Sequence, residues 1–208
     1  RLVGSEMCIR DSTTFYGMKL FVKEVIGKVF YLGLTSFGLF YWGIGWTLKK
    51  SCFLMAKFFK KRKIEMIEWV FLFLFLSMLG EILISSIYMH PVGNIDSLIY
   101  GRYDEFPVPV FLMIGAIAMS KSRWHFRGTL LAGTATGLMI PMLLEVIEAR
   151  ELSGLRGYMV AGISYLLKED SLDIYSFFQD TWMFGFFIML LVAFFIWLSE
   201  KRESLVWY

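Results

Sequence analysis

The sequence predicts an all-α fold, specifically a polytopic helical membrane protein with about five transmembrane helices. Two observations support this prediction. Hydrophobic residues make up 57% of the 208 residues and charged residues only 19%, which is more apolar and less charged than an ordinary soluble domain. The apolar residues also gather into long runs, several of which approach the roughly 20 residues that a helix needs to cross a bilayer.

Five apolar runs are the predicted spans. The first is uncharged and ends near Tyr41, Trp42 and Trp46, aromatic residues of the kind that gather at membrane interfaces. The third opens with Pro107, which a first helical turn tolerates because the missing N–H donor is not needed there. The five runs cover residues 29–48, 69–89, 106–120, 128–144 and 181–199.

The segment between the fourth and fifth runs, residues 145–180, is rich in acidic residues. Its one apolar piece, residues 157–167, is too short to cross a bilayer. We therefore expect an interfacial or re-entrant helix there, as part of an outer-face segment. A sixth crossing is the alternative.

Basic residues predict the orientation, because Lys and Arg in short loops are retained on the cytoplasmic side. They fall in three groups on one side: Lys49, Lys50, Lys57, Lys60, Lys61, Arg62 and Lys63; then Lys121, Arg123 and Arg127; then Lys201 and Arg202. We thus expect a multi-pass protein of the cell membrane with a cytoplasmic C-terminus and with residues 90–107 and 145–180 outside. The expected partner is membrane lipid and not nucleic acid, since the net charge is only +3 and the basic residues flank apolar runs.

The first twelve residues, RLVGSEMCIRDS, resemble a translated sequencing-library adaptor, because Met7 to Ser12 can be read from ATGTGTATAAGAGACAG. We expect residues 1–12 not to be native and residues 13–208 to form one helical transmembrane domain, the C-terminal fragment of a longer protein. A disordered polar N-terminus is the alternative. On the adaptor interpretation Cys52 is the one native cysteine, which leaves no disulfide framework.

The polar loop DSLIYGRYDEFP, residues 96–107, is the main candidate site. Its candidate substrate-binding residues are Tyr100, Arg102, Tyr103, Asp104 and Glu105. An arginine binds phosphate or carboxylate bidentately, carboxylates accept sugar hydroxyls or hold a divalent cation, and tyrosine rings offer stacking faces. The alternative is a solvated turn, in which the arginine pairs with its acidic neighbours and the tyrosines belong to an interfacial aromatic belt.

Glu81 lies inside the second apolar run, where an ionised carboxylate is costly and is usually functional or internally paired. We name it as a secondary catalytic candidate, which could form a proton relay with Ser85, Ser86 and His90. The alternative is a neutral carboxyl that hydrogen-bonds a neighbouring helix.

Three further patterns bear on packing and chemistry. Gly133 and Gly137 are four residues apart and predict close helix packing. The basic, Phe-rich residues 53–59 predict an amphipathic surface helix that touches anionic lipid. No HExxH, GxSxG, Walker A or GxGxxG sequence occurs, so no metal site and no cofactor are predicted apart from the divalent cation mentioned above.

Residues 29–120, and above all DSLIYGRYDEFPVPVFLMIG, resemble the C-terminal half of bacterial polytopic glycosyltransferases of the GT-C type. Those proteins often carry YGRY, then an acidic residue and a span opened by proline. The resemblance implies a lipid-linked donor such as a polyprenyl-phosphate sugar, transfer at the outer face of the cytoplasmic membrane, and ligand contacts from the loop residues named above. It also implies that the catalytic carboxylate lies upstream of this chain, so this fragment alone would be inactive.

Two other functions stay open at this point. One is a non-enzymatic transport or envelope-assembly component with Glu81 and His90 on a proton or solute path, which discontinuous spans would favour. The other is a membrane scaffold without a small-molecule site. In that case residues 96–107 form an ordinary turn with their charges in water.

Overall fold

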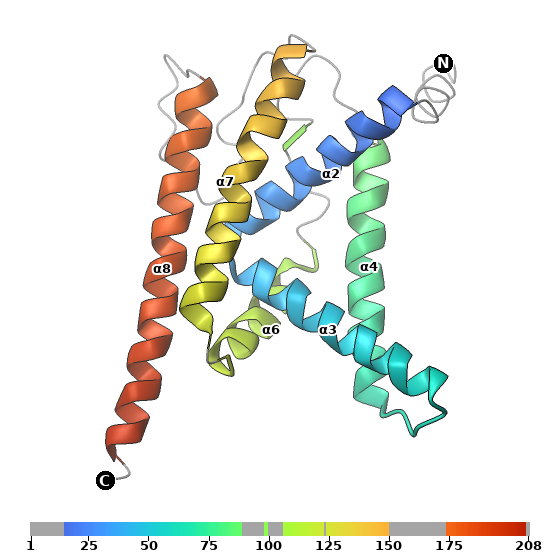
Figure 1. Ribbon diagram of the computed structural model, residues 1–208, viewed down its shortest axis with the longest axis vertical. Coiled ribbons are helices and arrows are strands. Elements are labelled where there is room, and N and C mark those ends of the chain that lie inside the picture. Colours follow the sequence, from blue (N-terminus) through green and yellow to red (C-terminus); the bar gives the residue numbers. More distant parts are fainter. Residues whose placement is uncertain (1–14, 89–97, 100–105, 123, 150–173, 207–208) are drawn as a thin grey trace.

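The computed structural model describes residues 15–88, 98–99, 106–122, 124–149 and 174–206. These residues form helices and connecting turns, with no strand among them, which confirms the predicted all-α class (Figure 1). The helices are α2 (Phe15–Thr35), α3 (Leu39–Phe59), α4 (Met66–Tyr88), α6 (Val108–Ser120), α7 (His125–Ala149) and α8 (Ile174–Val206).

Three of these helices contain stretches long and apolar enough to cross a membrane, namely Met66–Ile87, His125–Ala149 and Tyr175–Ser199. Among the described residues, α2 and α3 would make a fourth candidate span if they are counted together, although the two helices are bent by 116° relative to each other. At 13 residues, α6 is shorter than a span requires. The fold is compatible with a multi-pass membrane protein, while the predicted number of five spans stays a prediction.

The prediction of one continuous helix over residues 29–48 is wrong. The chain leaves the helix after Thr35, and Phe37 and Gly38 adopt left-handed φ values of 49° and 76°. The amide of Gly38 donates to the carbonyl of Gly33 at 2.8 Å and that of Phe37 to Leu34 at 3.0 Å. This pair of bonds is a Schellman motif, which satisfies the last carbonyls of α2 and lets the chain turn into α3.

Glycines let the helices pack closely at several contacts. Gly43 of α3 and Gly115 of α6 let these backbones touch, since a Cβ at Gly115 would lie 2.0 Å from the Leu39 carbonyl oxygen. Gly133 of α7 receives the ring of Phe186 on α8, and a Cβ there would lie 2.1 Å from that ring. The close packing predicted for Gly133 is confirmed. A single apolar core, with Phe30, Phe40, Phe111 and Phe178 among its members, joins the helices.

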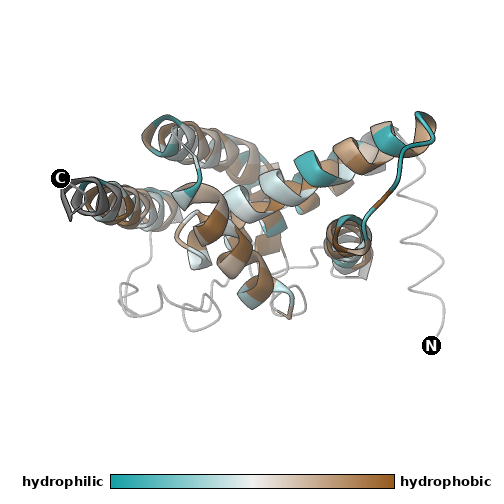
Figure 2. Cartoon of the chain, turned by 90° about the horizontal axis from the view of Figure 1, so that it is seen from below, coloured by the Kyte–Doolittle hydropathy of each residue, from teal (hydrophilic) through white to brown (hydrophobic). Residues whose placement is uncertain are grey.

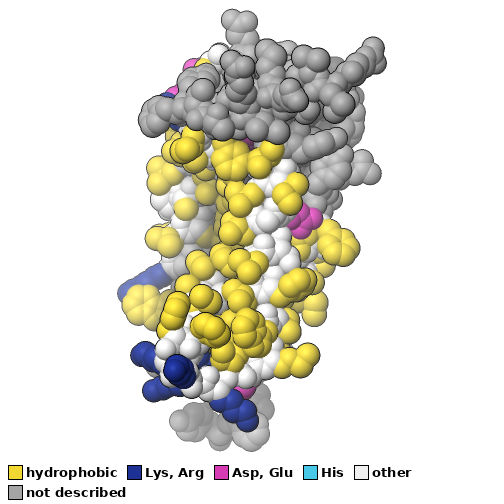
Figure 3. Space-filling view, turned by 90° about the vertical axis from the view of Figure 1, so that its right-hand side faces the viewer, with side chains coloured by type: hydrophobic (Ala, Val, Ile, Leu, Met, Phe, Trp, Pro, Cys, Tyr) yellow, Lys and Arg dark blue, Asp and Glu magenta, His cyan; other side chains and the backbone are white. Residues whose placement is uncertain are grey.

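Basic residues gather at one end of the bundle. The turn between α3 and α4, the turn between α6 and α7, and the C-terminal part of α8 lie at one end, which we call the basic end (Figure 1). In the view from below, hydrophilic residues lie in the α3–α4 turn, and hydrophobic residues are frequent along the helices (Figure 2). The helices α3 and α4 and the turn between them form a hairpin. On the face of the molecule over this hairpin, hydrophobic side chains cover the middle, and Lys and Arg gather at the lower end (Figure 3).

Candidate functional site

The predicted substrate-binding residues Tyr100, Arg102, Tyr103, Asp104 and Glu105 lie outside the described residues, as do His90 and the whole segment 157–167. Four residues of the loop are described, namely Leu98, Ile99, Phe106 and Pro107, and the side chains of Leu98 and Ile99 are buried. The Leu98 carbonyl lies against α2, because a Cβ at Gly27 would be 2.4 Å from its oxygen. The chain therefore enters the core of the bundle directly before the predicted site.

The secondary candidate Glu81 is half-buried in the C-terminal half of α4. Ser85 follows one turn later on the same face and is buried. Met78 and Ile82 on the neighbouring positions belong to the apolar core. Glu81 thus faces partly inward, while its catalytic or proton-relay role stays a prediction.

Sequence reasoning missed a group of buried charges on α2. Lys23, Glu24 and Lys28 are exposed by only 8%, 2% and 0%, although α2 belongs to the bent pair that could cross a membrane. Lys23 pairs with Glu145 of α7, with 2.5 Å between Nζ and Oε2. Buried ionisable groups in such helices are expensive and often functional. The available signal was the placement of these residues among apolar neighbours at helical spacing, just before the first predicted run.

A groove of about 820 Å³ lies between α3, α6 and α7 in the described part of the chain. This volume is within the range of pockets that bind small molecules and cofactors. Most of the wall is apolar, and Leu131, which lines it, is 75% exposed. The groove is therefore open at the side of the bundle, where α7 would meet lipid.

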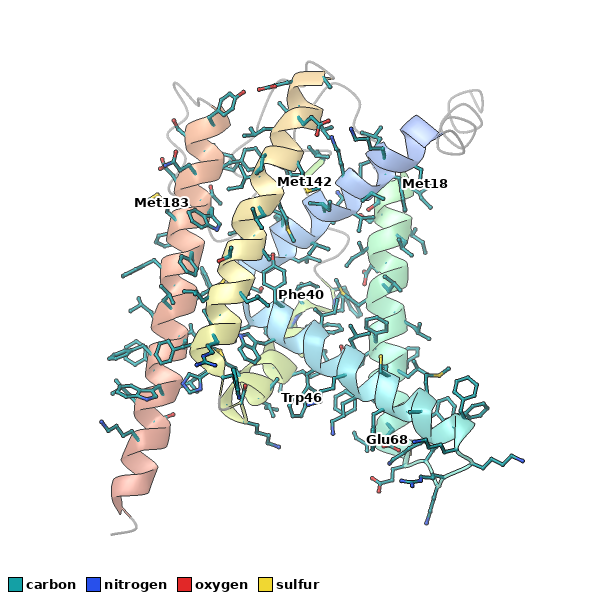
Figure 4. The ribbon with its side chains drawn as sticks, in the orientation of Figure 1. Met18, Phe40, Trp46, Glu68, Met142 and Met183 are labelled. Carbon is teal, nitrogen blue, oxygen red and sulfur yellow. The ribbon has the colours of Figure 1, made fainter. Side chains whose placement is uncertain are left out.

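Helical spacing explains why the groove is hollow. Gly128, Ala132 and Ala135 follow one face of α7 at intervals of one turn. Gly128 makes room for the ring of Trp42, since a Cβ there would lie 2.3 Å from it, and the small side chains of Ala132 and Ala135 leave space. Trp42 and Trp46 of α3 form the opposite wall. Figure 4 shows Trp46 on the lower side of α3, toward the basic end.

A polar pair lies at the inner side of the groove. The Tyr41 hydroxyl donates to the Val29 carbonyl at 3.3 Å and accepts from the Thr136 hydroxyl at 3.1 Å. These bonds join α2, α3 and α7 directly behind the groove. Its inner wall is consequently fixed by three helices.

Two lysines are among the residues that line the groove. Lys49 of α3 and Lys121 at the end of α6 both line it and are exposed. The guanidinium of Arg127 lies 4.5 Å from the ring centre of Trp124, another lining residue. No acidic residue is among the described residues that line the groove. Apolar walls with two lining lysines suit a ligand that has an apolar tail and an anionic head.

Other chemistry has less support in the described part of the chain. There, no group of three or more His, Cys, Asp or Glu residues could hold a metal ion. Cys52 is exposed on α3 and is not in a disulfide. Glu148 accepts a hydrogen bond from the Tyr175 hydroxyl of α8. The groove and the buried charges of α2 are the two features that call for a functional explanation.

The chain matches no protein-family model, no curated protein and no solved structure. The resemblance to GT-C glycosyltransferases therefore stays a prediction from the residues that suggested it.

Proposed function

We propose that this chain is part of a multi-pass membrane protein that binds a lipid-linked phosphate in the groove between α3, α6 and α7. One observation carries the proposal: one groove of about 820 Å³ combines mostly apolar walls with Lys49 and Lys121 among its lining residues. The tail of the ligand would lie along Trp42, Leu131 and Ala135. Its phosphate would lie between the two ammonium groups, which act as compact point charges for an anion.

The enzymatic form of the proposal is a glycosyltransferase that uses a lipid-linked sugar, since such donors are lipid phosphates. The groove would then hold the donor, and the transfer chemistry rests on the sequence resemblance alone. The groove and the resemblance differ in the side of the membrane that they imply. Retention of basic residues on the cytoplasmic side would place the lysines of the groove there, whereas the resemblance implies transfer at the outer face.

The proposal can be tested with purified, delipidated protein in a neutral detergent. We expect it to bind a polyprenyl phosphate and to bind the neutral polyprenol of equal tail length at least about tenfold more weakly, measured by native mass spectrometry. Ala135→Trp fills the groove and should abolish binding of the phosphate. Lys49→Gln combined with Lys121→Gln should remove the preference for the phosphate over the alcohol.

The matched control is Leu138→Trp, which adds a similar ring on an exposed position of α7 outside the groove. It should leave binding unchanged. Equal binding of the phosphate and the alcohol by the wild-type protein, or full binding by the Ala135→Trp variant, would contradict the proposal.

A transport component is the second candidate, because the structure has a feature that the sequence did not reveal. The bent pair α2–α3 is a discontinuous unit, and α2 carries buried Lys23, Glu24 and Lys28. Broken helices and buried charges together are typical of solute and ion pathways. Proteoliposomes that contain a pH-sensitive dye would test it: proton flux that Glu24→Gln abolishes favours transport, and no flux favours the first candidate.

A further inference from the structure

The end of the α3–α4 hairpin, residues 53–69, is a second surface that the groove does not explain. Figure 1 shows that α3 continues past α4 before the chain turns back. Phe53, Phe58, Phe59, Met66, Ile67 and Trp69 are all exposed large hydrophobic residues of this segment, and Phe59 and Met66 reach 77% and 84% exposure. A patch of this kind marks a surface that is covered by something other than water.

Four consecutive basic residues form the turn of this hairpin. Lys60, Lys61, Arg62 and Lys63 are all exposed. Lys61 has a left-handed φ of 51°, and the amide of Arg62 donates to the Lys57 carbonyl at 3.0 Å. This hydrogen bond closes the end of α3 in the same way as the Schellman motif at the end of α2. The cations are therefore displayed on a fixed turn and not on a loose loop.

A largely buried ion pair fixes the two arms of the hairpin. Lys57 Nζ lies 2.5 Å from Glu68 Oε1, and the side chains are only 21% and 11% exposed. The second carboxylate oxygen of Glu68 accepts from the amide of Glu65 at 3.0 Å. Glu68 is thus used within the hairpin, and Glu65 is the one remaining acidic residue in a segment with four exposed cations.

We infer that residues 53–69 form an anchor for the anionic headgroups of a bilayer, separate from the groove. The inference rests on the membrane location in the proposed function and not on the groove ligand. Met66 begins a stretch apolar enough to cross a membrane, so the turn before it lies at the depth of the headgroups. The aromatic and apolar side chains enter the interface, and the turn cations bind lipid phosphates.

The test uses the full chain in nanodiscs that contain equal amounts of phosphatidylcholine and phosphatidylglycerol. Native mass spectrometry then counts the lipids that stay bound to the protein after it is released from the nanodisc. The wild-type protein should retain phosphatidylglycerol several-fold over phosphatidylcholine. Replacement of Lys60, Lys61, Arg62 and Lys63 by glutamine should remove most of this preference.

A matched variant loses two exposed cations away from both the hairpin and the groove, through replacement of Lys19 and Lys201 by glutamine, and it is compared with a hairpin variant in which only Lys60 and Lys61 are replaced. It should keep most of the preference. An unchanged preference in the hairpin variant, or an equal loss in the matched variant, would overturn the inference. Circular dichroism confirms that each variant is helical before its lipids are counted.

The two proposals fail in distinguishable ways. Ala135→Trp should abolish binding of polyprenyl phosphate and leave the phosphatidylglycerol preference intact. Absence of the phosphatidylglycerol preference in the wild-type protein would refute the anchor and not the groove. Absence of polyprenyl phosphate binding by the wild-type protein would refute the groove and not the anchor.

Discussion

Lys23 of α2 and Glu145 of α7 form an ion pair, with 2.5 Å between Nζ and Oε2, although the lysine side chain is 10% exposed and the glutamate 57%. Lys19 reaches the same carboxylate at 3.2 Å, from a position that is 58% exposed. One carboxylate near the end of α7 therefore binds two lysines of the tilted helix α2. The contact fixes where α2 crosses the bundle.

The first prediction concerns this pair. Glu145→Gln should lower the melting temperature of the detergent-purified protein by several degrees, because it leaves the buried ammonium of Lys23 without the carboxylate that faces it. Lys23→Met should be milder, since it removes the buried charge and keeps an apolar stem.

Lys19→Gln is the internal control, because exposed ion pairs contribute little to stability. It should leave the melting temperature nearly unchanged. If Lys19→Gln and Glu145→Gln lower the melting temperature equally, burial of Lys23 is not what makes the contact important.

The second prediction concerns the break between α2 and α3. Gly38 has a φ of 76°, and a Cβ there would lie 2.4 Å from Met189 Sδ on α8. Gly38→Ala should lower the free energy of unfolding by about 1–2 kcal/mol for the left-handed backbone alone. Chemical denaturation followed by circular dichroism measures this change.

The control for Gly38→Ala is Gly80→Ala, at a helical position of α4 where a new Cβ meets nothing within 4 Å. It should be neutral or stabilising by up to about 1 kcal/mol, because alanine favours the helix interior. A destabilisation as large as that of Gly38→Ala would show that loss of any glycine is harmful and that the break has no special role.

The long apolar helices could be predicted from the sequence because each lies on a long, mostly apolar run. The run 69–89 matches the stretch Met66–Ile87, and the last two runs fall within α7 and α8. The break after Thr35 could not be predicted in the same way. Its residues are as apolar as their neighbours, and it depends on the backbone of Phe37 and Gly38, a local choice that hydropathy does not record.

The groove was also beyond the sequence, for a different reason. Its walls come from α3, α6 and α7, and its space depends on small residues such as Ala132 and Ala135 that carry no chemical signal alone. Lys49 and Lys121 belong to separate basic segments that only the fold brings to one groove. The loop that seemed most informative in the sequence contributes only Leu98, Ile99 and its last two residues to the described part of the chain.

The third prediction concerns the contact between α7 and α8. The indole N–H of Trp182 donates to the Gly133 carbonyl at 2.8 Å, and Phe186 stacks on Trp182 with 5.8 Å between ring centres. Gly133→Val should push the Phe186 ring away and destabilise the protein by about 1–3 kcal/mol, as overpacking does. Thr134→Val, at the adjacent exposed position, is the control and should change stability little.

The fourth prediction concerns the wall behind the groove. Tyr41→Phe removes the hydroxyl between the Val29 carbonyl and Thr136 and should cost about 1 kcal/mol. The volume of the groove should stay the same, so polyprenyl phosphate should bind as it does to the wild-type protein. A large loss of binding with unchanged stability would instead place this hydroxyl in direct contact with the ligand.

The most direct measurement of the central claim uses a lipid phosphate with a photoactivatable diazirine in its tail, followed by mass-spectrometric mapping of the labelled residues. Labelling should concentrate on the walls of the groove at Trp42, Leu131 and Ala135, and excess unlabelled lipid phosphate should suppress it. Labelling spread evenly over the outward residues Leu138, Phe187 and Phe195, and unaffected by that competitor, would contradict a lipid phosphate site between α3, α6 and α7.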